Sequence, residues 1–178
     1  MASSNITPTG REIEVPAGQF IVSKTDANSR IRYANRVFMA VSGFSEAQLQ
    51  GQSHNLIRHP DMPKGVFQKM WDQLKLGREF LGFVKNQCAN GDYYWVYAHV
   101  VIERDAAGQP VGYSSFQRRM PRSIVRDVEA VYAEMRQIEA QAGAQEAGAR
   151  SLAWFEQFLQ SKEMGYGQWV HMLYRRES

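Results

Sequence analysis

The chain has 178 residues, of which 44% are hydrophobic and 22% charged, and its formal net charge is +3 at pH 7. This length and hydrophobic content suffice for one hydrophobic core with a small appendage, so we expect a single soluble domain with extensions. The basic residues are scattered along the sequence rather than gathered in runs. This distribution argues against a nucleic-acid-binding protein.

Location and covalent chemistry are constrained by what the sequence lacks. No apolar run approaches the roughly 20 residues that span a bilayer, and residues 1–5 have no basic start or apolar core of a signal peptide. The single cysteine, Cys88, excludes an internal disulfide and any multi-cysteine metal site. We therefore expect a cytoplasmic protein with no transmembrane segment and no bound metal.

The regular structure is predicted to begin with a β-hairpin. Residues 20–25 are rich in β-branched and aromatic side chains, which favour a strand. Residues 30–34 alternate polar and apolar side chains, as a half-buried strand does. The small polar residues 26–29 between them are typical of a turn.

Three helices are predicted to follow the hairpin. Residues 35–42 have the apolar spacing of a short amphipathic helix, and Gly43 follows at the position of a C-terminal glycine. Ser45 and Gln48 have the spacing of a capping box, which predicts a second short helix. A third and longer helix, over residues 63–77, begins with proline and ends with glycine.

Three further strands are predicted to complete the sheet. Asn90 and Gly91 separate the alternating apolar runs 80–88 and 93–103, and an Asn-Gly pair in this position strongly indicates a hairpin. Residues 111–117 form the last strand. Strands at both ends with helices between them predict an α+β fold, in which a five-stranded antiparallel sheet carries short helices on one face.

We divide the chain into four parts on this basis. Residues 20–120 form the α+β domain, and residues 1–19 precede it as an N-terminal cap. Residues 121–142 form a helix with apolar residues at alternating spacings of four and three, which suits either a short coiled coil or packing onto the sheet. Residues 143–178 contain a linker and amphipathic helices that either dimerise, bind a partner or pack against the domain.

A loop before the third helix concentrates charged side chains. Arg58, His59 and Asp61 lie in a segment that also holds Pro60 and Pro63. Proline fixes its own backbone and restricts the residue before it, so these side chains project from a stiffened chain. One interpretation is a charged surface turn. The other, which we favour, is the wall of a ligand pocket, where Arg58 is suited to a phosphate or a ring edge.

Several motifs resemble those of PAS domains. Residues 33–35 end the second strand, residues 41–45 open the helices and residues 91–96 lie in the long strand, as in that fold. A narrower resemblance lies in residues 54–63, which with residues 84–86 are similar to the FAD-binding PAS domain of bacterial aerotaxis receptors. The resemblance implies a PAS fold.

The resemblance, which covers about residues 11–135, also implies a function. It implies that FAD is held noncovalently between the sheet and the short helices, and that the protein senses the redox state of the cell. The positions that match cofactor-binding positions of the family are Asn35, Arg58, His59, Asp61, Phe67 and Asn86. Each residue also has a structural alternative, since Asn35 can end a strand, Asn86 can satisfy a strand edge and Phe67 can belong to the core.

Two further pocket positions depart from the family pattern. Phe80 stands where aerotaxis receptors commonly have tryptophan, and Gln117 stands where they have arginine. Gln117 resembles the glutamine of flavin-binding light-oxygen-voltage domains and is therefore a candidate transducer. The reactive cysteine of those photosensors is absent, because His54 takes its place. These departures favour redox signalling over an adduct-forming photocycle.

Strand alternation predicts which side chains face the pocket. If Asn86 points inward, then Cys88 shares its face near the pocket rim and Lys85 points outward. In the following strand the aromatic side chains Trp95 and Tyr97 lie on the outer face. Such a surface usually has a partner, either a second copy or a docked flanking helix, and we expect a homodimer through the sheet or the flanking helices.

Two other functions remain open from the sequence. A haem-binding PAS domain would use His54, His59 or His99 as an axial ligand, and a PAS domain without cofactor would serve as an interaction module. An enzyme is not expected, because no nucleophile, base and orienting group occur at recognisable spacing. The downstream partner has no signature in the sequence.

Overall fold

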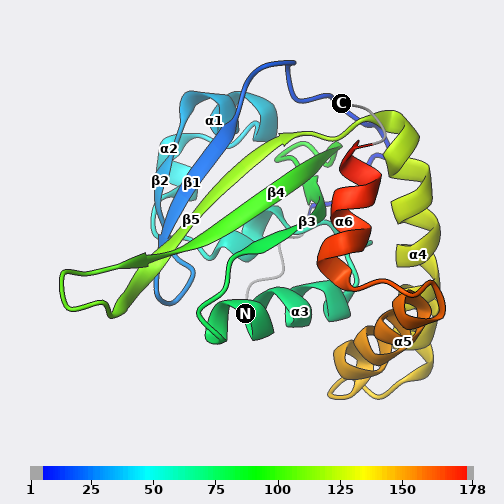
Figure 1. Cartoon of the computed structure of the whole chain (residues 1–178). Coiled ribbons are helices and arrows are strands. Elements are labelled where there is room, and N and C mark those ends of the chain that lie inside the picture. The colour runs from blue at the N-terminus through cyan, green and yellow to red at the C-terminus, as the bar shows by residue number, and fades with distance from the viewer. Residues whose placement is uncertain (1–5, 176–178) are drawn as a thin grey trace.

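The computed structural model describes residues 6–175 and shows one antiparallel sheet with helices on both of its faces (Figure 1). The first five residues of the expected N-terminal cap and residues 176–178 lie outside the described residues. Within the described part, no helix has the length and apolar character needed to cross a membrane.

The sheet has five strands in the order β2-β1-β5-β4-β3, and every neighbouring pair is antiparallel. Their bounds are β1 Ile21–Asp26, β2 Ile31–Ala34, β3 Phe80–Gln87, β4 Tyr93–Arg104 and β5 Pro110–Arg119. The last strand returns to the centre of the sheet beside the first, which brings the two ends of the domain together. The predicted α+β fold with a five-stranded antiparallel sheet is confirmed.

Four short helical elements follow the first hairpin. They are α1 Arg36–Ser42, α2 Glu46–Leu49, the 3₁₀-helix η1 His54–Ile57 and α3 Lys64–Lys75. The predicted capping box of α2 is present, because Ser45 accepts from the Gln48 backbone and the Gln48 side chain accepts from the Ser45 backbone. Gly43 ends α1 with a φ of 72°, a conformation that glycine adopts without steric cost.

The inner face of the sheet is the one that carries Ser23, Asn86 and Gln117, and α3 lies over it. The outer face carries Trp95 and Tyr97. Three C-terminal helices, α4 Arg122–Gln141, α5 Ala147–Ser161 and α6 Tyr166–Arg175, complete the chain. Figure 1 shows α6 in front of β3 and β4 and α4 beside them.

The C-terminal helices pack on the sheet domain itself. The ring of Tyr132 on α4 lies 6.1 Å from that of Trp95, and the ring of Tyr174 on α6 lies 4.6 Å from that of Tyr97. Three of the apolar positions of α4 that suited a coiled coil, Ile124, Val128 and Met135, are buried in this interface. Of the two alternatives for this helix, the structure shows packing onto the sheet.

Helix α5 connects the two faces because it packs against both α4 and α3. Its approach to α3 depends on Gly65, where an added Cβ would lie 2.4 Å from Ser151 Oγ and 2.8 Å from Leu152 N. The carboxylate of Glu139 on α4 accepts hydrogen bonds from the Gly65 N–H at 3.1 Å and from Ser151 Oγ at 2.6 Å. One side chain thereby fixes the start of α3 to α5.

Candidate cofactor-binding site

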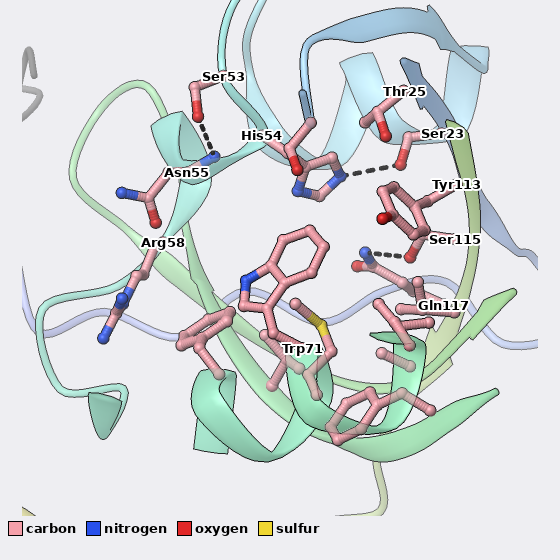
Figure 2. Close-up of a pocket in the computed structure, with 18 of the residues that line it drawn as sticks. Ser23, Thr25, Ser53, His54, Asn55, Arg58, Trp71, Tyr113, Ser115 and Gln117 are labelled. Carbon is pink, nitrogen blue, oxygen red and sulfur yellow. Dashed lines mark hydrogen bonds between the residues drawn. The ribbon is translucent and has the colours of Figure 1, made fainter. Parts of the chain in front are cut away.

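A cavity of about 440 Å³ lies between the inner face of the sheet and α3 (Figure 2). This volume is in the range of about 300–1,000 Å³ that is usual for small-molecule sites. Its apolar side is formed by Phe67, Met70, Trp71, Leu74, Phe80, Val84, Ala98 and Val100. The polar side is formed by Ser23, Thr25, Asn28, Ser29, Ser53, His54, Asn55, Arg58, Asn86, Tyr113, Ser115 and Gln117.

A chain of hydrogen bonds joins three polar side chains in the cavity wall. Asn86 Nδ2 donates to Gln117 Oε1 at 3.1 Å, and Gln117 Nε2 donates to Ser115 Oγ at 3.1 Å. Asn86 and Gln117 are each only 3% exposed. Two buried amides in a cavity wall present donors and acceptors that a ligand with a polar edge can use.

The hydroxyl groups of β1 form a second polar region. Ser23 Oγ lies 2.9 Å from Nε2 of His54, and burial lowers the pKa of His54 to about 4, so the imidazole is neutral at physiological pH. The hydroxyl of Thr25 is buried and has no hydrogen-bond partner within the described residues. A buried hydroxyl without a partner is costly, and a ligand in the cavity is able to satisfy it.

Arg58 lies at the rim of the cavity, at the C-terminal end of η1. Its backbone bridges that of Asn86, its Nη2 donates to the Met62 carbonyl at 3.0 Å, and its guanidinium lies 4.2 Å from the centre of the Phe67 ring. Burial lowers the pKa of Arg58, but the group remains a cation. A fixed cation at a cavity rim suits an anionic part of a ligand.

His59 and Asp61 lie outside the cavity lining and hold the loop behind it. Nδ1 of His59 accepts from the Asp61 N–H at 3.1 Å, and the Asp61 carboxylate accepts from Lys85 Nζ at 2.8 Å. Burial acts to raise the pKa of Asp61, but the hydrogen bond and positive charge of Lys85, together with the nearby His59 and Arg136, outweigh it and the pKa is lowered. Burial and the neighbouring Lys85 lower the pKa of His59 to about 4.

Asn35 also lies outside the cavity lining. Its Oδ1 accepts from the N–H groups of Phe38 and Val22 at 2.9 and 3.1 Å, and its Nδ2 donates to the Phe20 carbonyl at 2.8 Å. The side chain thus caps α1 and ties it to the start of β1. These bonds correspond to the structural alternative for this residue.

One expectation from strand alternation is confirmed and one needs correction. Lys85 points to the outer face as expected, yet it is only 7% exposed, because it pairs with Asp61 and lies 4.2 Å from the centre of the Tyr93 ring under α4. Cys88 is not among the residues that line the cavity, and its Sγ donates to the Val41 carbonyl at 3.4 Å. Burial raises the pKa of this thiol to about 12.

Several lining residues were not predicted, among them Thr25, Trp71, Tyr113 and Ser115. The signal for Thr25, Tyr113 and Ser115 was the alternation of β1 and β5, in which inward positions that normally belong to a core are polar. No group of metal-ligating side chains forms a metal site in residues 6–175.

The sheet and the helices over its inner face have the PAS fold. Residues 31–117 match the PAS fold family, which confirms the resemblance seen in the sequence. The order of the strands, the short helices over the inner face and the cavity between them are the features of this class that the structure shows.

The chain is similar to the aerotaxis receptor of Escherichia coli strain K12, with 45% identity over 113 residues, which cover 63% of this chain and 22% of the receptor. It is also similar to a nitrogen fixation regulatory protein of Klebsiella pneumoniae, with 32% identity over 97 residues, which cover 54% of this chain and 20% of that protein. The chain therefore matches only about a fifth of the length of these relatives.

Solved structures show the same fold. A light-oxygen-voltage domain superimposes with a TM-score of 0.55 and 19% identity, over 61% of this chain and 82% of that one. A PAS domain from Colwellia psychrerythraea superimposes with a TM-score of 0.52 and 20% identity, over 57% of this chain and 86% of that one.

Proposed function

We propose that this PAS domain binds FAD noncovalently in the cavity and relays the redox state of the flavin to a partner. The observation that carries the proposal is that the cavity collects most of the residues that the family resemblance singled out. These are Arg58, Phe67, Phe80, Asn86 and Gln117. They come from four different elements, so their convergence reflects the fold and not the spacing in the sequence.

The residues present fit the chemistry of a flavin. A flavin has a polar edge of carbonyl and ring nitrogen groups, an apolar ring end and a phosphate-bearing chain. Asn86 and Gln117 supply amides for the polar edge, and Phe80 is part of the apolar wall. Arg58 supplies a cation for the phosphates, and the unpartnered hydroxyl of Thr25 gains a partner.

The relatives support a sensory role. An aerotaxis receptor and a nitrogen fixation regulatory protein both carry a matching domain, and the fold is shared with light-oxygen-voltage domains. When FAD is bound it supplies the redox chemistry, and the protein supplies binding and relay. We extend the proposal to a cytoplasmic homodimer that acts on a signalling partner, as expected from the sequence, and not to an enzyme.

A relay route starts at Gln117. The next residue, Arg118, points to the outer face and lies 5.1 Å from the ring centre of Tyr97 and 4.2 Å from that of Tyr174 on α6. A change in the hydrogen bonds of Gln117 moves the strand that carries both residues. The contact of Arg118 with Tyr174 then transmits that movement to α6.

A second route leads through the loop that carries Arg58. Arg136 on α4 donates to the Asp61 carbonyl at 2.9 Å, and Glu139 accepts from the Gly65 N–H at 3.1 Å. The loop is therefore held by α4 at two points. Displacement of Arg58 by a bound phosphate would act directly on α4, without movement of the sheet.

The absorbance spectrum of the purified protein tests the proposal. Bands near about 375 and 450 nm are expected for an oxidised flavin, and chromatography of the released cofactor distinguishes FAD from FMN. A single intense Soret band would identify haem, for which His54 is the histidine that lines the cavity. Protein that stays colourless after incubation with FAD would contradict cofactor binding and favour an interaction module.

A double variant tests the position of the site. Arg58→Ala combined with Asn86→Ala removes the rim cation and one wall amide, and we expect FAD to be lost on gel filtration. Arg32→Ala, on the exposed side of β2, serves as the control and should retain FAD. If the double variant keeps FAD as tightly as the native protein does, the cavity is not the flavin site.

A further inference from the structure

Two aromatic side chains of low oxidation potential meet inside the cavity. Trp71 on α3 and Tyr113 on β5 both line it, and their rings pack edge to face with centres 5.3 Å apart and planes at 79°. Figure 2 shows the indole of Trp71 extending from α3 toward His54 and Gln117. A ring system bound in this cavity would contact the indole directly.

The cavity offers no thiol to an excited flavin. The one cysteine of the chain, Cys88, hydrogen-bonds to the Val41 carbonyl and is not among the lining residues. Covalent addition of sulfur to the flavin is therefore not available. Electron transfer from an aromatic side chain is the photochemistry that the lining residues permit, because indole and phenol are the most readily oxidised groups in the cavity wall.

We propose that Trp71 is a one-electron donor to photoexcited flavin in this cavity, with Tyr113 as its neighbouring donor. The inference rests on the proposed flavin site. If FAD is bound there and excited by light, the indole of Trp71 would give up one electron to it, which would leave the indole oxidised by one electron and the cofactor reduced by one. No bond is made or broken in this step.

The electron then has two fates. It returns to the indole, which ends the excited state without emission of light. Alternatively, a dithiol such as dithiothreitol returns an electron to the oxidised indole, and the reduced flavin accumulates. Over two such cycles the dithiol loses two electrons and two protons and closes to a disulfide, and the flavin takes up the two electrons and two protons. Trp71 is only partly buried, so a small reductant is able to reach it from solvent. The positive charge of Arg58 at the rim stabilises the negative charge that the flavin would gain on reduction.

The consequence is weak flavin fluorescence and, when a thiol is present, reduction of the flavin by light. We expect Trp71→Phe, loaded with FAD, to emit several-fold more strongly than the native holoprotein and with a longer lifetime. We expect Tyr113→Phe to have a smaller effect. Trp154→Phe is the matched control, because Trp154 lies on α5 and not in the cavity lining, and its emission should equal that of the native protein.

Two further measurements do not depend on emission, and the second of them compares the native holoprotein with Trp71→Phe. Transient absorption should show the oxidised indole appearing as the excited flavin decays, and illumination without oxygen in the presence of dithiothreitol should reduce the flavin more slowly in Trp71→Phe. Equal emission of native and Trp71→Phe holoproteins, or decay without an indole signal, would overturn the donor role alone. Protein that never takes up FAD would overturn the flavin site as well, so the two failures are distinct.

Discussion

Asn86 and Gln117 hydrogen-bond through their side-chain amides, with 3.1 Å between Asn86 Nδ2 and Gln117 Oε1, although β4 separates their strands in the sheet. The bond therefore crosses over a strand and joins β3 to β5 through the cavity. Ser115 completes the chain as acceptor from Gln117. The same atoms that stabilise the cavity wall are the ones that a ligand edge would contact.

This arrangement predicts energetic coupling between the two amides. Asn86→Ala and Gln117→Ala should each reduce the free energy of unfolding by about 1–3 kcal/mol, because each leaves a buried partner unsatisfied. Because the two amides are each other's partners, the double variant should lose less free energy of unfolding than the two single variants lose together. The difference, the coupling energy, should be about 0.5–3 kcal/mol. Urea denaturation of the four proteins without FAD measures this cycle.

Saturating FAD provides the control for the same cycle. A ligand edge that contacts the remaining amide replaces the lost partner, so the coupling energy should fall when FAD is bound. Coupling that is unchanged by FAD would indicate that the flavin does not touch this pair.

The sheet and the first helices were predictable because local signals were strong. The Asn90–Gly91 turn and the capping box at Ser45 are found where they were predicted. The 3₁₀-helix over residues 54–57 was not predicted, since one turn has no periodicity to detect. The docking of α4 was undecided, because its apolar spacing serves a coiled coil and a sheet face equally well.

The cavity was predictable only in part. The resemblance pointed to Arg58 and Asn86, which line it, but a sequence motif does not separate residues that contact a ligand from residues that hold a loop. His59 and Asp61 lie in supporting positions here, and their role in binding remains a prediction. Trp71 was not predicted as a lining residue, because the apolar face of a helix has the same sequence pattern whether it meets a half-open cavity or a core.

His54 makes stability depend on pH between about 4 and 6.5. Burial lowers its folded pKa from 6.5 to about 4, so within this window the unfolded chain binds a proton that the folded chain does not. Stability is therefore lost as the pH falls from 6.5, by up to about 1.4 kcal/mol per pH unit for one such group. Urea denaturation across the window should show a shallower dependence for His54→Gln.

His59 acts in the same window, because burial and Lys85 lower its pKa to about 4 as well. His54→Gln should therefore remove only part of the pH dependence, and His171→Gln, on the exposed side of α6, provides the control. A native-like slope in His54→Gln would mean that the imidazole does not stay neutral in the folded protein.

Asp92 predicts a second loss of stability at lower pH. Hydrogen bonds from Arg11 and then Thr9 lower its pKa from 3.8 to about 2, so its contribution is complete above 3.8 and is lost as the pH falls toward 2. Asp92→Asn should be less stable than the native protein at neutral pH and should lose less on acidification. The exposed Asp72→Asn is the control. If the native protein and Asp92→Asn lost stability equally as the pH falls from 3.8 to about 2, the lowered pKa of Asp92 would be contradicted.

Two glycines at the second position of their helices should respond to alanine with opposite signs. In Gly65→Ala the new Cβ would lie 2.8 Å from the backbone nitrogen of Leu152, so α5 must shift, at a cost of about 1–3 kcal/mol. Gly167→Ala on α6 meets nothing within 4 Å, so its higher helix propensity should stabilise by up to about 1 kcal/mol. Hydrogen exchange of the backbone amides of α5 should be faster in Gly65→Ala than in the native protein and should be unchanged in Gly167→Ala. Unchanged α5 protection in Gly65→Ala would mean that the close contact of α3 and α5 does not persist in solution.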